Sequence, residues 1–245
     1  MCYENADDID DRITLSFQGS KGRRLKMQLV DKIYQKIRDD VTHGKLSPGE
    51  RLLESKLVGE FKCSRSPVRE ALRRLQSEGL LIFEPNKGST ICKLSSQDIG
   101  EIYSIISYLE GYAARLSVER FDRNNLRNNL SYLRELQKKL KKAAEADDPV
   151  QWLENNTLFH NFFSQHAGNA ILCQMLENLR RRVYQYRYIT IRIRNHFEKY
   201  LNHHQRILEA YEAFDGKMIE KVMRLHTETV RDVLIDYLNK FPSFR

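Results

Sequence analysis

The sequence predicts a mainly α-helical protein built from two modules, and three observations support this fold class. Apolar residues recur at spacings of three and four along most of the 245 residues, which is typical of amphipathic helices. Two adjacent β-type runs interrupt this pattern between residues 80 and 94. The chain is also longer than one usual domain and long enough for two. Residues 1–25 lack periodicity and are expected to form a flexible arm.

The first module is expected to cover residues 26–94. Its predicted helices lie at 26–43, 54–61 and 65–78. Pro48-Gly49 signals a turn after the first helix, and Gly79 is placed to end the third. The runs LLIFEP and GSTICKL then predict two short strands, joined by a tight turn at Asn86-Lys87-Gly88. A helix, a helix–turn–helix pair and a hairpin, in this order, describe a winged helix-turn-helix.

The third helix, in the run CSRSPVREALRRL, has a well-defined start and one apolar face. Ser64 is a good N-cap, and Pro67 in the first turn removes an N–H that has no helical partner. The apolar stripe consists of Val68, Ala71, Leu72 and Leu75. We expect this stripe to fix the helix against its neighbours, so that the arginines lie on the other faces.

The second module is expected to cover residues 95–245 and to be entirely helical. Its candidate helices are 96–119, 123–146, 149–166, 170–193, 196–214 and 216–240. Turn signals separate consecutive helices at Asp147-Asp148-Pro149, Ala167-Gly168-Asn169 and Asp215-Gly216. The pattern predicts an all-α antiparallel helical bundle that is large enough to bury its own core.

The composition narrows the class of partner. A formal net charge of +8 favours an anionic partner, although a merely basic surface is the alternative. Residues 26–94 hold 14 lysines and arginines against nine acidic residues. The four cysteines form no C-x-x-C pair, which favours free thiols in a reducing compartment. There is no apolar run of the roughly 20 residues that a membrane span needs and no signal-peptide pattern, so we expect a cytoplasmic protein without membrane contact.

The basic third helix suits a DNA-reading role. Arg65 and Arg69 lie one turn apart near its start, the end that enters the major groove in a helix-turn-helix. Arginine makes bidentate contacts with guanine or with phosphate. Ser64 and Ser66 can donate to phosphates, and Lys87 at the hairpin tip can reach the minor groove or the backbone. The alternative is a solvated helix in which Arg69 braces the turn internally.

The segment LSPGERLLESKLVGEFKCSRSPVREALRRLQSEGLLIFEPNKGSTI resembles the DNA-binding domain of the GntR family of bacterial transcription regulators. The helical remainder resembles the FadR-type subfamily, whose C-terminal module is the FCD ligand-binding domain. This resemblance implies a homodimer that binds palindromic operator DNA and responds to a small-molecule effector. The DNA contacts that it implies are Arg65 and Arg69, assisted by Ser64, Ser66, Lys87 and Gly88.

The resemblance also implies a metal site. Many FCD domains bind a divalent metal through one acid and three histidines, and the matching positions here are Asn156, His160, His204 and His226. Asn156 and His160 share one helix face at a spacing of four. Asn156 replaces the usual acid and brings no charge, so such a centre would lean on an anionic ligand. Imidazole-rich sites suit Zn, Ni or Fe. The alternative is a polar pocket whose histidines hydrogen-bond the effector directly.

A second departure from the family pattern concerns the effector. Ile106 stands where family members often carry an arginine that helps to hold an acidic ligand. Arg187, in the run LRRRVYQYRYITIRIR, can take over this role or can lie at the surface. An organic acid bound at the metal centre is the expected effector.

Two other classes of protein compete with a ligand-responsive regulator. A metalloenzyme is not expected, because the sequence has no H-E-x-x-H, G-x-S-x-G or P-loop motif. No carboxylate neighbours the proposed ligands in sequence as an obvious general base. A constitutive architectural DNA-binding protein would not need a buried histidine cluster. Metal content separates it from a sensor, and turnover assays separate the enzyme.

Overall fold

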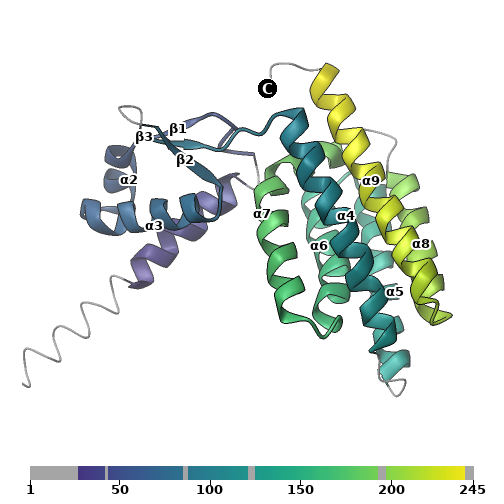
Figure 1. Ribbon diagram of the computed structural model, residues 1–245. Coiled ribbons are helices and arrows are strands. Elements are labelled where there is room, and N and C mark those ends of the chain that lie inside the picture. Colours follow the sequence, from purple (N-terminus) through teal and green to yellow (C-terminus); the bar gives the residue numbers. More distant parts are fainter. Residues whose placement is uncertain (1–26, 42–43, 85–87, 121–124, 193–196, 241–245) are drawn as a thin grey trace, which may run out of the picture. The chain divides into compact units, whose positions relative to one another are not determined.

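The computed structural model describes residues 27–41, 44–84, 88–120, 125–192 and 197–240, except for the side chains of 185 and 188–192 (Figure 1). The chain divides into two compact units: one contains residues 27–41 and 49–92, and the other contains the short segment 44–48 and the residues from Lys93 onward. The first holds a small sheet with helices, and the second is mainly helical in its described part. None of the described helices combines the length and the apolarity that crossing a membrane requires.

Three helices form most of the described first unit. They are the helix over residues 27–41, α2 (Glu54–Phe61) and α3 (Arg65–Ser77). α2 ends at Lys62, whose left-handed backbone (φ 47°) redirects the chain toward α3. Each helix buries one stripe, and the core contains Val30, Ile33, Tyr34, Ile37, Val41, Leu57, Val68, Ala71, Leu72 and Leu75. The buried stripe of α3 is the one that its spacing predicts.

The ends of α3 follow from local signals. Ser64 occupies the N-cap position with an extended backbone, although its side chain makes no capping hydrogen bond. Pro67 lies in the first turn and is buried. Beyond the C-cap Glu78, Gly79 takes a positive φ of 74°, a conformation that glycine adopts without a Cβ clash.

A three-stranded antiparallel sheet completes the first unit. β1 (Arg51–Leu52), β2 (Leu81–Glu84) and β3 (Gly88–Ile91) lie in the order β1-β3-β2. β2 and β3 pair from Leu81 opposite Ile91 to Glu84 opposite Gly88, as the predicted hairpin requires. The sequence did not predict β1, because two residues are too few to show a strand periodicity. The predicted turn residues 86 and 87 lie outside the described residues.

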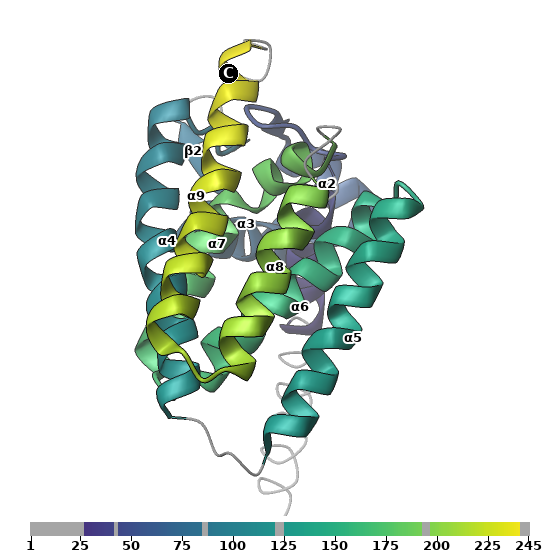
Figure 2. The same ribbon diagram turned by 90° about the vertical axis from the view of Figure 1, so that its right-hand side faces the viewer.

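Six helices make up the described second unit (Figure 2). They are α4 (Ser96–Glu119), α5 (Leu126–Glu145), α6 (Pro149–His166), α7 (Ala170–Arg192), α8 (Phe197–Glu212) and α9 (Gly216–Lys240). α4, α6 and α9 have the predicted bounds. α8 ends at Glu212 rather than at residue 214, where Phe214 takes a left-handed backbone (φ 54°). The predicted starts of the second and fifth helices of this unit, at 123 and 196, lie outside the described residues.

Helix caps fix where α4 and α6 begin. Ser95 and Asp98 form a capping box: the Asp98 N–H donates to Ser95 Oγ at 3.1 Å, and the Ser95 N–H donates to Asp98 Oδ2 at 2.8 Å. Asp148 caps α6 by accepting from the N–H groups of Val150 and Gln151, and Pro149 stands at the first helical position. These starts orient the helices that carry the site.

α4 and α9 lie side by side and antiparallel in both views (Figures 1 and 2). Gly111 allows the close approach, because a Cβ there would lie 2.6 Å from Cγ of Arg224 and 3.0 Å from the backbone oxygen of Glu220. The bundle core contains Phe159, Phe163, Ile207, Tyr211, Val222 and Met223. This packing brings the middle of α4 against the middle of α9, where the polar site lies.

Candidate functional site

The start of α3 exposes the residues predicted to contact DNA. Ser64, Arg65, Ser66 and Arg69 are all exposed. Arg65 has no hydrogen-bond or ion-pair partner within the described part of the chain. Gly88, at the first position of β3, has a positive φ of 85° and open space around it. Lys87 lies outside the described residues.

Two arginines of α3 brace the first unit internally. Arg69 Nε donates to both carboxylate oxygens of Glu54 on α2, at 2.9 and 3.1 Å. Because the pair is exposed, it is weak and leaves the guanidinium able to exchange partners. Arg74 donates to Asp31 at 2.8 Å, and its guanidinium lies 4.0 Å from the ring centroid of Tyr34. Arg74 therefore joins α3 to the first helix.

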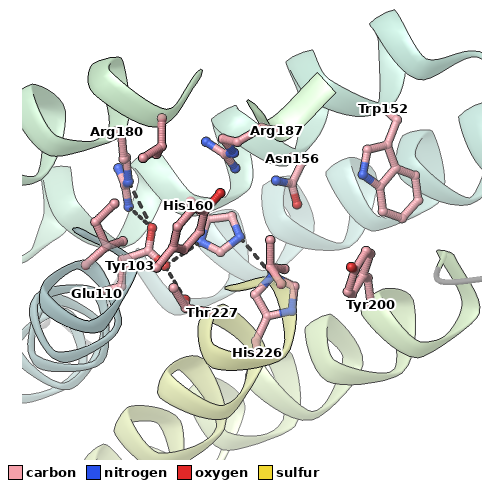
Figure 3. Close-up of a pocket in the computed structure, with 13 residues that line it drawn as sticks. Tyr103, Glu110, Trp152, Asn156, His160, Arg180, Arg187, Tyr200, His226 and Thr227 are labelled. Carbon is pink, nitrogen blue, oxygen red and sulfur yellow. Dashed lines mark hydrogen bonds and ion pairs between the residues drawn. The ribbon is translucent and has the colours of Figure 1, made fainter. Parts of the chain in front are cut away.

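A small pocket lies inside the bundle, between α4, α6, α7, α8 and α9 (Figure 3). Its volume is about 40 Å³, which is room for about three water molecules. The sequence-predicted residues that line it are Ile106, Asn156, His160, Arg187 and His226. The packing thus brings together residues from four helices that sequence analysis had assigned to one site.

Three histidines meet beside this pocket. His160, His204 and His226 are 3%, 0% and 3% exposed. One ring nitrogen from each of them lies within 4.8 Å of the nitrogens from the other two. Nε2 of His160 lies 3.2 Å from Nε2 of His226. The His204 ring stacks on Phe159 with centroids 4.3 Å apart, and neither of its nitrogens has a hydrogen-bond partner among the described residues. Unpartnered buried nitrogens call for an ion, a water or a ligand.

Burial keeps these imidazoles neutral. It lowers the pKa of His160 and holds the pKa values of His204 and His226 well below their usual range, because the charged form loses its hydration inside the bundle. A neutral ring keeps one nitrogen lone pair, which is the form that binds a metal ion. His203 is also buried, but the three-histidine set that the described residues form contains His204 instead.

The charged network beside the histidines was not predicted from the sequence. Glu110 on α4 is 5% exposed and forms an ion pair with Arg180 on α7: its Oε1 accepts a hydrogen bond from Nε at 2.9 Å and lies 2.8 Å from Nη2. The Thr227 hydroxyl on α9 donates to Oε2 of Glu110 at 2.6 Å. Nδ1 of His160 lies 3.3 Å from the same oxygen, at ion-pair distance but off the direction of a hydrogen bond. Glu110 therefore links α4, α6, α7 and α9.

The carboxyl of Glu110 is ionised in this setting. Burial by itself favours the neutral acid, but His160, Arg180 and the Thr227 hydroxyl outweigh burial and hold the pKa of Glu110 well below its usual range. A signal for this network exists in the sequence. Glu110 stands four residues after Ile106 on the buried stripe of α4, and Arg180 stands four residues after Leu176 on that of α7. Charges at such positions need partners.

The remaining pocket wall combines apolar and phenolic groups. Ile106 is 2% exposed and offers no polar atom at the position where the resembling family often carries an arginine. Arg187 lines the pocket from α7, as one of its two predicted placements requires. The hydroxyl of Tyr103 is buried without a hydrogen-bond partner among the described residues, and burial raises the pKa of Tyr103 to about 12. This phenol is a neutral donor available to a ligand.

Comparison with known proteins identifies the two units. Residues 29–91 match the family model described as bacterial regulatory proteins, gntR family, and residues 101–229 match the FCD domain. The chain belongs to the GntR family of bacterial transcription regulators. This GntR-family regulator is 32% identical to the HTH-type transcriptional regulator McbR of Escherichia coli (strain K12) over 185 residues, which are 73% of this chain and 82% of McbR. It is 30% identical to the HTH-type transcriptional regulator YdhC of Bacillus subtilis (strain 168), over 72% of this chain and 77% of YdhC.

Solved structures agree with the family assignment. E. coli McbR/YncC matches this GntR-family regulator with a TM-score of 0.73 and 26% identity, over 85% of this chain and 98% of that chain. A GntR-type regulator from Rhodococcus sp. RHA1 shares the fold, with a TM-score of 0.69 and 18% identity, over 84% of this chain and 97% of that chain. The predicted fold class, a winged helix-turn-helix followed by a helical FCD bundle, is confirmed. The relatives are transcription regulators rather than enzymes.

Proposed function

We propose that this GntR-family regulator binds palindromic operator DNA as a homodimer in the cytoplasm, and that an effector bound in the bundle pocket changes its affinity for DNA. The observation that carries the proposal is the pocket of buried neutral histidines, which lies in a different unit from the exposed arginine end of α3. A sensor needs a ligand-binding unit that is separate from its DNA-binding unit. A purely architectural DNA-binding protein has no use for the pocket.

In this proposal Arg65 and Arg69 make the principal DNA contacts. Their exposure at the start of α3, together with that of Ser64 and Ser66, supports this assignment. Arg69 would exchange Glu54 for a base or a phosphate. Gly88 and Lys87 would assist from the wing. We assign no DNA contact to Arg74, because its guanidinium donates to Asp31 and lies over the Tyr34 ring.

An exposed stripe on α4 supports the homodimer. Ile105, Tyr108 and Tyr112 follow one another at helical spacing and are 49%, 59% and 44% exposed. Glu101 and Arg115 lie on the same side, each seven residues from Tyr108. In an antiparallel pairing of two α4 helices about a two-fold axis at Tyr108, each Glu101 therefore faces the other copy's Arg115. A two-fold interface needs this kind of self-complementary surface, so a second copy of the chain is the occupant that we propose.

Charge reversal tests this interface. Glu101→Lys should shift the species seen by native mass spectrometry from dimer toward monomer, and Glu101→Lys/Arg115→Glu should restore the dimer. Ile171→Asp on α7 is the matched control, because Ile171 is 72% exposed and lies off the stripe. Tyr112→Asp is a second variant on the stripe and should also shift the protein toward monomer. If Glu101→Lys and Tyr112→Asp both remain dimeric while Ile171→Asp dissociates, the interface lies elsewhere.

The pocket suits a metal centre completed by an anionic effector. Three neutral imidazoles can serve as the protein ligands of Zn²⁺, with a further position open to a ligand. The amide oxygen of Asn156, one turn before His160 on α6, is the fourth proposed donor. When bound, the ion would attract a carboxylate, for which Arg187 and the Tyr103 hydroxyl offer further contacts. These groups favour a small organic acid. Ni²⁺ and Fe²⁺ suit the same donors.

α7 offers a route from the pocket toward the DNA-binding unit. Arg180 and Arg187 reach the site from this helix, and the Tyr186 hydroxyl accepts the N–H of Leu94 at 2.7 Å. Leu94 immediately precedes α4 and lies two residues beyond Cys92, where the first unit ends. An effector that displaces α7 would therefore act on the segment that joins the units.

DNA-binding titrations test the whole proposal. An operator is first selected from random duplexes, and its affinity is then measured by fluorescence anisotropy at fixed salt with metal-stripped protein, with Zn²⁺, and with Zn²⁺ plus a panel of carboxylic acids. We expect a sequence preference and a change in affinity with one of the acids. His226→Gln should keep DNA binding and lose the response. Binding without sequence preference under every condition would refute the proposal.

A further inference from the structure

We propose that Glu110 positions His160 for metal binding and supplies, through that ring, the negative charge that Asn156 does not bring. This inference rests on the metal centre proposed above and gives Glu110 a role beyond its ion pair with Arg180. Glu110 is a positioning residue, because it acts through His160 and does not contact the ion.

The two oxygens of Glu110 have different partners. Oε1 accepts the hydrogen bond from Arg180 Nε and lies at ion-pair distance from Nη2, whereas Oε2 accepts the hydrogen bond from Thr227 at 2.6 Å. Because Arg180 and Thr227 come from α7 and α9, the carboxylate on α4 is held from two sides. Oε2 is thereby fixed 3.3 Å from Nδ1 of His160 (Figure 3).

The His160 ring connects Glu110 with the histidine cluster. Nδ1 faces Glu110, whereas Nε2 lies 3.2 Å from Nε2 of His226. A carboxylate beside Nδ1 favours the tautomer with the proton on Nδ1, so that the lone pair of Nε2 is available to an ion. Of the three clustered histidines, His160 is the one with a carboxylate at ion-pair distance among the described residues.

The contact between Glu110 and His160 would offset part of the positive charge of a bound metal ion. A dication bound by three neutral imidazoles and an amide keeps its whole charge in a buried place, where solvent screens poorly. The Glu110 carboxylate is one ring away from the proposed ion. The contacts with the Arg180 cation are made by Oε1, whereas Oε2, the oxygen that lies near His160, accepts from the neutral Thr227 hydroxyl. The negative end of the ion pair therefore faces His160.

A matched pair of variants separates this role from a structural one. Glu110→Gln keeps the size of the side chain and removes its charge. Arg180→Met breaks the same ion pair and leaves the carboxylate beside His160. In calorimetric titrations of Zn²⁺ into metal-stripped full-length protein, we expect Glu110→Gln to weaken binding roughly 10- to 100-fold and Arg180→Met to stay below that range. Equal losses in the two variants would overturn the proposal, because they would show that the ion pair only supports the fold.

The tautomer of His160 is an independent readout that needs no metal. Long-range ¹H–¹⁵N correlation spectra of histidine-labelled protein report it, and His160→Gln assigns the signal. We expect the proton on Nδ1 in the wild type and in Arg180→Met, and a share on Nε2 in Glu110→Gln. An Nε2–H tautomer in the wild type would overturn the positioning role even if Zn²⁺ binds. Failure of the wild type to bind Zn²⁺ would instead overturn the metal centre, and with it the charge-supplying role.

Discussion

Replacing Arg180 by methionine removes the cation whose Nε and Nη2 lie 2.9 and 2.8 Å from Oε1 of Glu110. The carboxylate is 5% exposed, and the pocket beside it has room for about three water molecules, so hydration replaces the lost cation only in part. Removing one member of a buried ion pair costs about 3–5 kcal/mol, because the other charge stays buried and uncompensated. For a protein of this size each kcal/mol lowers Tm by roughly 2–4 °C, so we expect Tm to fall by roughly 6–20 °C.

Trp152 makes the assay specific to the bundle. It is the single tryptophan of the chain, lies on α6 and is 2% exposed, so its fluorescence follows unfolding of the helical unit. Urea titrations of metal-free protein then give the free energy of unfolding. Arg180→Met/Glu110→Gln should recover at least half of the loss, because it removes the orphaned charge. A loss below about 1 kcal/mol in Arg180→Met, as exposed pairs give, would refute the buried-pair reasoning.

Three further predictions concern other parts of the chain. Arg65→Ala should cost about 1–3 kcal/mol in operator affinity if Arg65 reads a base, and anisotropy titrations should show a smaller loss on unrelated duplexes. Gly111→Ala should destabilise the bundle by about 1–3 kcal/mol, seen as a lower urea midpoint, because its Cβ would clash with α9. The pKa values of His204 and His226 are lower in the folded than in the unfolded chain. Below pH 6.5 the unfolded chain therefore binds more protons than the folded chain, and lowering the pH favours unfolding. The free energy of unfolding of metal-free protein should therefore fall by about 1 kcal/mol for each of His204 and His226 between pH 7.5 and 5.5, and a flat urea midpoint over this range would contradict their neutrality.

Local signals allowed most of the helices to be predicted. The Ser95–Asp98 capping box and the Asp148-Pro149 start are each written in fewer than five consecutive residues, so α4 and α6 begin where the sequence predicts. β1 has no such signal, because its two residues become a strand only by pairing with β3. The histidine cluster was assigned through the family resemblance, and the packing of α6, α8 and α9 brings three of the four predicted ligands together.

The Glu110 network shows where sequence reasoning stops. Its members come from α4, α6, α7 and α9, and no spacing within one helix connects Glu110 with Arg180 or Thr227. The sequence does reveal that Glu110 and Arg180 occupy apolar stripes, which predicts that each needs a buried partner. Which partner each finds depends on how the helices pack. The close contact of α4 with α9 at Gly111 is part of that packing.

The small volume of the pocket has a consequence for the speed of the response. About 40 Å³ does not hold an organic acid of several carbon atoms, since a single water already takes 10–15 Å³ by the same measure. Such an acid therefore fits only after the surrounding helices have moved apart. Its observed association rate should then level off at high concentration, at the rate of helix opening, and the delay before DNA affinity changes would be set by the protein rather than by diffusion of the acid.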